Sequence, residues 1–245
     1  MDTLRFEIQK SYPFTQNITE RMANLMHIFG LTLLRLEKMS FHHVLDVTLR
    51  PGDICYITGE SGAGKSVLLR EMQKIAPVNN RINIADIPLE SNRSLIDSIA
   101  LQDDSLFATL DVLSAAGLSD ALAMLSCPSV LSEGQAFRYR LAQALLSGKQ
   151  YVFADEFLAS VDRLSAMVIS ANLRRIARNS GRVFILASAH SDVMVDLQPD
   201  VIVVKYPGGA TDIRYRDSSR QKGPRKLFPS WVKERMQRKS RTDNK

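Results

Sequence analysis

Short runs of almost wholly apolar residues recur along this chain, and longer stretches of mixed apolar and polar residues separate them. Runs of this kind are typical of strands that are buried on both faces of a parallel sheet. Strands that alternate with helices predict an α/β fold. The apolar runs that predict central strands lie at residues 53–58, 150–154 and 183–187.

The remaining pattern predicts further elements on either side of this framework. Apolar residues at helical spacing from 18 to 29 predict a helix that Asn17 caps. Two alternating runs, 201–205 and 211–215, surround a Pro-Gly-Gly turn and predict a hairpin. Strands are also expected at residues 31–36, 44–49 and 81–87, and helices at 67–74, 111–125, 135–146 and 158–177.

A glycine-rich stretch directly follows the first central strand and precedes a predicted helix. It fits G-x-x-x-x-G-K-[ST], the pattern of a phosphate-binding loop. Glycines let successive backbone N–H groups point at a phosphate chain, and the helix adds the positive end of its dipole. Lys65 is expected to reach the β- and γ-phosphates, and the Ser66 hydroxyl is expected to ligate Mg²⁺. The residues expected to contact the nucleotide are Gly59, Glu60, Ser61, Gly62, Ala63, Gly64, Lys65, Ser66 and Val67.

Two acidic residues, Asp155 and Glu156, follow the apolar strand at 150–154. Ligands bind at the carboxyl ends of strands in open α/β sheets, so these carboxylates are expected beside the phosphate loop. Hydrolysis of a nucleoside triphosphate needs a carboxylate that organises Mg²⁺ and a group that polarises the attacking water. We assign the first role to Asp155 and the second to Glu156. Acids that favour a helix start are the plainer alternative, and the phosphate loop outweighs it.

Further motifs stand in the order found in ATP-binding-cassette (ABC) ATPases, and the chain resembles that family. Residues 131–135, Leu-Ser-Glu-Gly-Gln, resemble the family's signature and lie just before the acidic strand. Gln102 matches the Q-loop glutamine, residues 159–162 resemble the D-loop, and His190 resembles the switch histidine. The resemblance implies a P-loop NTPase fold with a RecA-like core, an N-terminal β subdomain and a short helical arm that carries the signature.

The resemblance also implies a role for each motif. The glycine-rich loop corresponds to Walker A, the ligands are ATP and Mg²⁺, and two copies of the chain are expected to hold two nucleotides between them, head to tail. The signature would contact the γ-phosphate that the other copy holds. The catalytic residues are then Glu156, His190 and Gln102. The metal ligands are Ser66, Gln102 and Asp155, and the contacts made across the dimer come from Ser132, Gly134, Gln135 and Asp162.

The chain departs from the family pattern in several places. Glu133 replaces the first glycine of the signature, and Gln143 stands where an arginine is usual. Only residues 103–130 separate the Q-loop glutamine from the signature, whereas transport ATPases usually carry a longer helical arm on which the membrane subunit docks. Phe29 and Phe41 are the candidates for an aromatic residue that stacks on adenine.

Charge and composition bear on the location of this protein in the cell and on its partners. The chain has 245 residues and a net charge of +6, and residues 217–245 hold ten Lys or Arg and three Asp or Glu. We expect an ATPase domain at 1–216 and a basic tail at 217–245, which either binds nucleic acid or an anionic surface or is a solvated extension. Two cysteines, no signal-peptide pattern and no apolar run of membrane length favour a cytoplasmic protein without a transmembrane segment.

The sequence alone therefore predicts an ABC-type ATPase that hydrolyses Mg-ATP as an ATP-dependent homodimer. We expect the closure of the dimer to act on an unknown partner. An ATP-binding subunit of a membrane transporter is one alternative, and the short arm argues against it. An ABC ATPase that acts on nucleic acid is a second alternative, and the basic tail is its support. The sequence specifies neither the partner nor the driven process nor the selectivity for the base.

Overall fold

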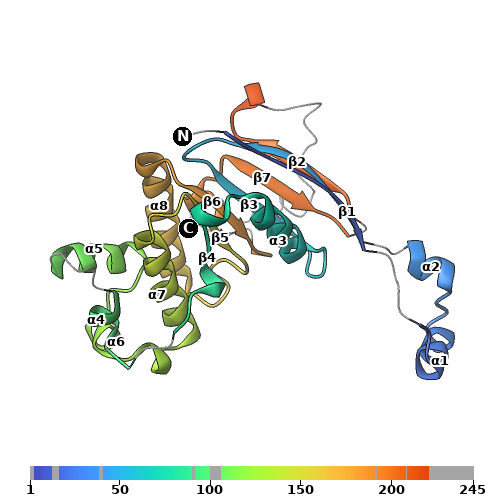
Figure 1. Ribbon diagram of the computed structural model, residues 1–245, viewed down its shortest axis with the longest axis horizontal. Helices are drawn as coiled ribbons and strands as arrows, with labels where there is room; N and C mark the ends of the chain where they lie inside the picture. Colours follow the sequence, from blue (N-terminus) through green and yellow to red (C-terminus); the bar gives the residue numbers. More distant parts are fainter. Residues whose placement is uncertain are drawn as a thin grey trace, which may run out of the picture.

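A parallel sheet with one antiparallel edge forms the centre of the fold (Figure 1). The computed structural model describes residues 3–12, 17–38, 41–89, 92–99, 106–190, 192–207 and 209–220. Within these residues the strand order is β4-β5-β6-β3-β7-β8, and β8 runs antiparallel to β7. The strands are β3 (Ile54–Gly59), β4 (Arg81–Asn83), β5 (Tyr151–Ala154), β6 (Val183–Ala187), β7 (Val201–Lys205) and β8 (Thr211–Tyr215).

Helix α3 (Lys65–Ile75) lies between this sheet and a second, two-stranded one. The second sheet pairs β1 (Leu4–Tyr12) antiparallel with β2 (Phe41–Leu49). The buried side chains of Leu68 and Met72 on α3 pack in one cluster with apolar residues of both sheets. The helix that begins at the glycine-rich loop is thus held from both sides.

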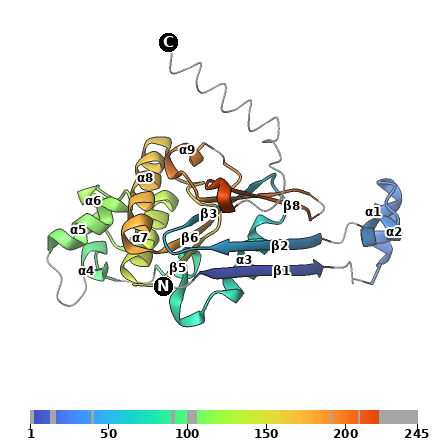
Figure 2. The same ribbon diagram turned by 90° about the horizontal axis from the view of Figure 1, so that it is seen from above.

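The opposite face of the main sheet is covered by α7 (Glu133–Leu146) and α8 (Arg163–Ser180) (Figure 2). Tyr56 and Phe184 point to this face, whereas their neighbours Cys55 and Ile185 point to α3, as the period of two in a strand requires. A group of short helices packs beside α7 and α8 and forms a helical arm. The arm consists of α4 (Leu95–Ile99), α5 (Leu106–Ala115), α6 (Ala121–Leu125) and η3 (Pro128–Val130).

Between β1 and β2 the chain makes an excursion away from the body. Its helices are α1 (Glu20–Ile28) and α2 (Leu33–Lys38), and both views show them standing apart at the end of the β1–β2 ribbon (Figures 1 and 2). The remaining short helices are η1 (Val78–Asn80), η2 (Ile84–Asp86), α9 (Met194–Leu197) and η4 (Ser218–Arg220). None of the described helices has both the length and the apolar character needed to cross a bilayer.

The α/β prediction is confirmed, and the elements whose type or start was wrong, or that were missed, lie in the first quarter of the chain. The predicted strand at 31–36 is wrong, because this stretch enters helix α2. The Leu, Arg, Glu and Lys residues of α2 are strong helix formers, and no described residue of the excursion pairs with it as a strand. The helix that follows Asn17 begins later than predicted, since Thr19 is the residue that caps α1 through its side chain. Strand β1 was not predicted.

Two further elements differ in length from their predictions. The strand expected at 81–87 ends after β4, because Asn83 caps the 3₁₀ turn η2 with its side chain. The helix expected at 111–125 is divided into α5 and α6 at Gly117, which has a φ of 79° in the left-handed region. Glycine adopts this backbone conformation without a steric penalty, so α5 ends there.

Candidate functional site

The glycine-rich loop joins the end of β3 to the start of α3, as predicted. Gly59 has a φ of 147°, and a Cβ at this position would lie 2.1 Å from the carbonyl oxygen of Lys205. Gly62 and Gly64 have φ values of 77° and 89°. The close approach of β7 and the left-handed turns therefore require glycine at these three positions.

Lys65 points back at the loop from the first turn of α3. Its Nζ donates to the carbonyl oxygens of Gly59 at 3.0 Å and Glu60 at 2.8 Å. Burial lowers the pKa of the Lys65 ammonium, and the nearby carboxylates of Asp155 and Glu156 act in the opposite direction. The loop thus holds a cation whose present partners are neutral carbonyl groups.

One cavity of about 280 Å³ is lined by the loop and by the two acids and the histidine that follow other strands. Parallel strands bring their carboxyl ends to one edge of a sheet, which is why motifs distant in sequence meet here. Glu60 and Ala63 complete the turn, because the Ala63 N–H donates to the Glu60 carbonyl oxygen. The predicted residues that line the cavity are Ser61, Gly62, Gly64, Lys65, Ser66, Val67, Asp155, Glu156 and His190.

The two acids sit on a tight turn at the end of β5. Glu156 has a φ of 47°, and its N–H donates to Oδ1 of Asp155 at 3.0 Å. The N–H of Phe157 then donates to the carbonyl oxygen of Ala187, which ties the turn to β6. A non-glycine residue in this conformation costs roughly 1–3 kcal/mol and is most often found at functional sites. From this turn both acids line the same cavity.

His190 is positioned through its backbone by residues of two neighbouring strands. Its N–H donates to Oγ of Ser188 at 3.2 Å, and its carbonyl oxygen accepts from the buried hydroxyl of Tyr56. Burial raises the pKa of the Tyr56 phenol, so the hydroxyl stays protonated and able to donate. The imidazole is left exposed at the mouth of the cavity.

The signature residues begin helix α7, outside the cavity. Ser132 caps the helix, because its Oγ accepts from the N–H of Gln135 and its own N–H donates to Oε1 of Gln135. A Cβ on Gly134 would lie 2.6 Å from the carbonyl oxygen of Ser160, so only glycine fits. Asp162 caps α8 by accepting from the Ser165 N–H at 2.9 Å. The signature and the D-loop therefore touch each other within one chain.

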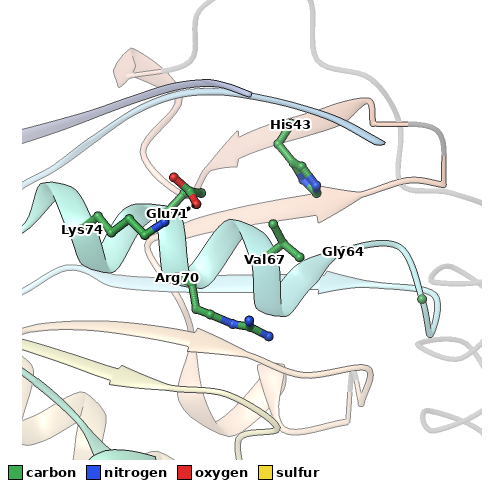
Figure 3. A pocket seen from close by; sticks show the side chains of 7 residues that line it. His43, Gly64, Val67, Arg70, Glu71 and Lys74 are labelled. Carbon is green, nitrogen blue, oxygen red and sulfur yellow. Dashed lines mark hydrogen bonds and ion pairs between the residues drawn. The ribbon is translucent and has the colours of Figure 1, made fainter. Parts of the chain in front are cut away.

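A second cavity, which the sequence did not predict, lies on the other side of the loop (Figure 3). It has a volume of about 320 Å³ and lies between α3 and β2. His43 on β2 is 1% exposed and points toward the start of α3, where a Cβ on Gly64 would lie 2.6 Å from its ring. Val67 and Arg70 extend the wall along α3. Alternating burial along β2 is the signal in the sequence that places His43 inside.

Three predicted residues need separate mention. Gln102 lies outside the described residues. The strand position of Phe41 is described, but its side chain is not. Phe29 ends α1 in the excursion with a largely exposed ring, and it lines neither cavity.

The donor set in the first cavity suits a hard divalent cation. Mg²⁺ prefers oxygen ligands and is usually held by one or two protein groups together with phosphate oxygens and water. The Ser66 hydroxyl and the Asp155 carboxylate line the same cavity and provide such groups. No cluster of three or more His, Cys, Asp or Glu occurs among the described residues, so this part of the chain holds no ready-made cage of metal ligands.

Comparison with known proteins gives matches in sequence and in structure. Residues 42–159 match the model of a family described as ABC transporter. The aliphatic sulfonates import ATP-binding protein SsuB 1 of Paracoccus denitrificans is 27% identical over 177 residues, which cover 66% of this chain and 72% of the relative. The methionine import ATP-binding protein MetN of Streptococcus pyogenes is 26% identical over 228 residues, which cover 77% and 63%.

Two solved structures give the same picture at lower sequence identity. A dimeric bacterial ABC transporter cassette matches with a TM-score of 0.60 and 16% identity over 87% of this chain and 98% of its own. A dimeric post-hydrolysis state of an ATP-binding cassette bound to ADP and phosphate matches with a TM-score of 0.62 and 15% identity over the same shares of both chains.

Proposed function

Because this chain belongs to the ATP-binding-cassette family of ATPases, we propose that it hydrolyses Mg-ATP between two head-to-tail copies and serves as the ATP-binding subunit of a transport system. ATP binding and hydrolysis follow from the family. The observation that carries the finer proposal is the separation of its motifs. The loop, both acids and the histidine line one cavity, whereas the signature begins α7 outside it. A second copy is needed to bring a signature to that cavity.

The transport role is favoured by the relatives and reverses our first preference. The named relatives are import ATP-binding proteins, so they support the transporter alternative over an ATPase with an unrelated partner. They give no support to an action on nucleic acid. The short arm remains a departure from transport ATPases, but its helix α5 exposes Leu106 and Phe107, which suit an apolar partner surface.

We assign the following roles within the first cavity. The loop N–H groups and the start of α3 bind the phosphate chain, and Lys65 exchanges its carbonyl partners for phosphate oxygens. Ser66 and Asp155 would hold Mg²⁺, which neutralises phosphate charge when bound. Glu156 accepts a hydrogen bond from the attacking water, and His190 orients the γ-phosphate.

Between the two copies, the signature completes the site. The Oγ of Ser132 and the N–H of Gly134 would contact the γ-phosphate that the other copy holds, while the Gln135 amide keeps Ser132 in place. The second cavity takes the nucleobase, because it adjoins the loop on the side away from the two acids. There His43 and Val67 line the wall of the cavity beside the loop.

The dimer is tested with a protein that binds ATP without hydrolysing it. Glu156→Gln keeps the cradle but removes the carboxylate that polarises water, so we expect a dimer in ATP and a monomer without it. Adding Ser132→Arg should restore the monomer, because a long cation blocks the composite site. Sedimentation velocity measures both. A Glu156→Gln protein that stays monomeric at saturating ATP would contradict the proposal.

The role in transport has its own test. Glu156→Gln protein, trapped with ATP in cells and purified from solubilised membranes, should retain a polytopic membrane protein. A matched preparation with Lys65→Ala also present should lose it. If both preparations retain the same soluble partner and neither retains a membrane protein, the result would contradict the transport role and favour an ATPase that acts on that soluble partner.

A further inference from the structure

The excursion between β1 and β2 is far longer than a connection between paired strands requires. Tyr12 and Phe41 face each other in the register of the antiparallel pair, so a turn of two to five residues would join them. Residues 13–40 stand there instead, and α1 and α2 lie within this range. Both helices project beyond the end of the ribbon, away from the rest of the chain (Figures 1 and 2).

The excursion has an apolar surface that is exposed to solvent and that its own side chains do not cover. Helix α1 has no buried residue. The two helices half-bury a few side chains, such as Met22 and Leu31, but their other apolar residues remain exposed. Clustered exposure of this kind marks an interaction surface. The excursion surface consists of Leu25, Ile28, Phe29, Leu33 and Leu34, with exposed fractions of 50–75%.

The helical arm carries a second uncovered apolar surface near the signature. Its members are Leu122 and Leu125 on α6 and Val130 in η3, which are exposed by 69–76%. The arm is acidic, since residues 89–131 contain six Asp or Glu and one Arg, a net charge of −5.

The charges of the excursion complement those of the arm. Residues 13–40 contain three Lys or Arg and two Asp or Glu, a net charge of +1. Arg21 and Arg35 are exposed beside the apolar surface of the excursion, and Asp120 is exposed at the start of α6. Opposite charges around apolar centres are the usual arrangement of a specific protein interface.

Both surfaces lie next to the halves of the composite ATP site. The excursion re-enters the fold at Phe41, two residues before His43, whose ring touches the loop at Gly64. Val130 lies two residues before Ser132, the cap of the signature helix. In a head-to-tail dimer the loop of one copy faces the signature of the other. The excursion of the first copy then lies beside the arm of the second.

We propose that α1 and α2 of one copy dock on α6 and η3 of a second copy and clamp the ATP-bound dimer. Two-fold symmetry makes this contact twice. The inference rests on the head-to-tail dimer proposed above, and it names the surface that strengthens it. A lipid surface is the less suitable occupant, because binding to anionic lipid relies on a cluster of basic residues and the excursion has a net charge of only +1.

Cross-linking between two different copies tests the contact directly. One preparation carries Phe29→Cys and the other Val130→Cys, both in a Glu156→Gln protein in which Cys127→Ser removes the partly exposed native thiol. Mixed and oxidised with copper phenanthroline, they should form a disulfide-linked dimer in ATP and not without it. Val78→Cys replaces Val130→Cys as the control. Val78 is equally exposed but follows the far end of α3, roughly 15 Å along the helix from the loop.

Shortening the excursion tests its contribution to the dimer. In a Glu156→Gln protein, residues 13–40 are replaced by Asn-Gly, and a second variant carries Ile28→Ser and Phe29→Ser. We expect both variants to bind ATP as before, while the dissociation constant of the dimer rises at least tenfold. The double-serine variant keeps the full length of the excursion, so it still tests the contact if the shortened protein misfolds.

The outcomes separate this inference from the proposal on which it rests. If the full Glu156→Gln chain does not dimerise in ATP, the sandwich fails and the clamp fails with it. If the chain dimerises with no cross-link and no loss in either variant, only the clamp is overturned. Binding of the full chain to phosphatidylserine vesicles that both variants lose, with dimerisation unchanged, would assign the excursion to a membrane and also overturn the clamp.

Discussion

At the scale of single residues, the loop lysine illustrates how the site is prepared for an anion. Lys65 Nζ is held by the carbonyl oxygens of Gly59 and Glu60, and burial lowers its pKa. Neutral carbonyl groups compensate a partly buried cation less well than a phosphate does. Binding of a phosphate chain therefore replaces weak partners of the ammonium with strong ones.

Removing this cation should affect the binding of ATP. We expect Lys65→Ala to lower the affinity for ATP at least tenfold, because a hydrogen bond to a charged group contributes about 1.5–3 kcal/mol. Isothermal titration calorimetry measures the affinity. Lys149→Ala, a half-buried lysine after the end of α7 that lines neither cavity, is the control and should bind ATP like the parent. Near-normal affinity of Lys65→Ala would contradict the assignment of the loop.

His43 allows the base site to be tested separately from the phosphate site. We expect His43→Ala to lower the affinity for ATP about fivefold, because a contact between an aromatic ring and the base is worth about 1 kcal/mol. Inorganic triphosphate has no base, so its affinity should not change. His43→Tyr should keep most of the ATP affinity. Equal losses for ATP and triphosphate, measured by competition, would show that His43 only supports the loop at Gly64.

The residues of the first cavity were predictable because each belongs to a spaced motif. Asp155 directly follows one apolar strand, and Lys65 and His190 lie in the segments that follow two others; a parallel sheet brings such positions to one edge. His43 belongs to no motif, and its burial depends on β1 pairing with β2 and covering α3. The alternation along β2 places His43 on the inward face, but only this tertiary contact brings it beside the loop.

At the scale of elements, the signature helix and the D-loop behave as one unit. Gly134 in the first turn of α7 lies against the carbonyl oxygen of Ser160, directly before α8. Arg138 of the same helix donates to the carbonyl oxygens of Gly134 and Gly117, which ties the first turns of α7 to the end of α5. A change at the start of α7 is therefore transmitted to the turn that follows the two acids.

A methyl group at this contact tests the coupling. We expect Gly134→Ala to lower the free energy of unfolding by about 1–3 kcal/mol, because the added Cβ would lie 2.6 Å from a backbone oxygen. ATPase activity should fall as well, since the D-loop must shift. Glu133→Ala, an exposed change on the same turn, should leave the urea unfolding midpoint nearly unchanged. A Gly134→Ala protein as stable as the parent would show that the backbone at this contact shifts to accept the methyl group without loss of stability.

Elements were predicted well where the hydrophobic pattern was unambiguous. Strand β6 was predicted at its observed bounds, and the helix predicted at 135–146 lies within α7 and shares its last residue. The stretch at 31–36 alternates like a strand but enters helix α2, and none of the described strands lies beside it to pair with. A period of two predicts a strand only where a sheet is available to pair with.

At the scale of the whole molecule, the last described residues are fixed to the core. Arg220 donates to both carboxylate oxygens of Asp53 and to the carbonyl oxygen of Thr48. Asp53 is 4% exposed, and it also accepts from the N–H of Arg50. The fold therefore extends past the expected boundary of the ATPase domain at 216, as far as Arg220.

This contact predicts where the chain can be shortened. Truncation after Arg220, which removes residues 221–245, should leave ATP hydrolysis and the urea unfolding midpoint unchanged, because the proposed site residues all lie before it. Truncation one residue earlier, or Arg220→Ala in the full chain, should lower the free energy of unfolding by about 3 kcal/mol. Removal of one partner leaves the Asp53 carboxylate buried without its cation. The pair of truncations differs by a single residue, so a difference between them isolates this ion pair from every effect of the tail. If both truncated proteins unfold at the midpoint of the parent, Arg220 contributes nothing to the core and the fold ends before it.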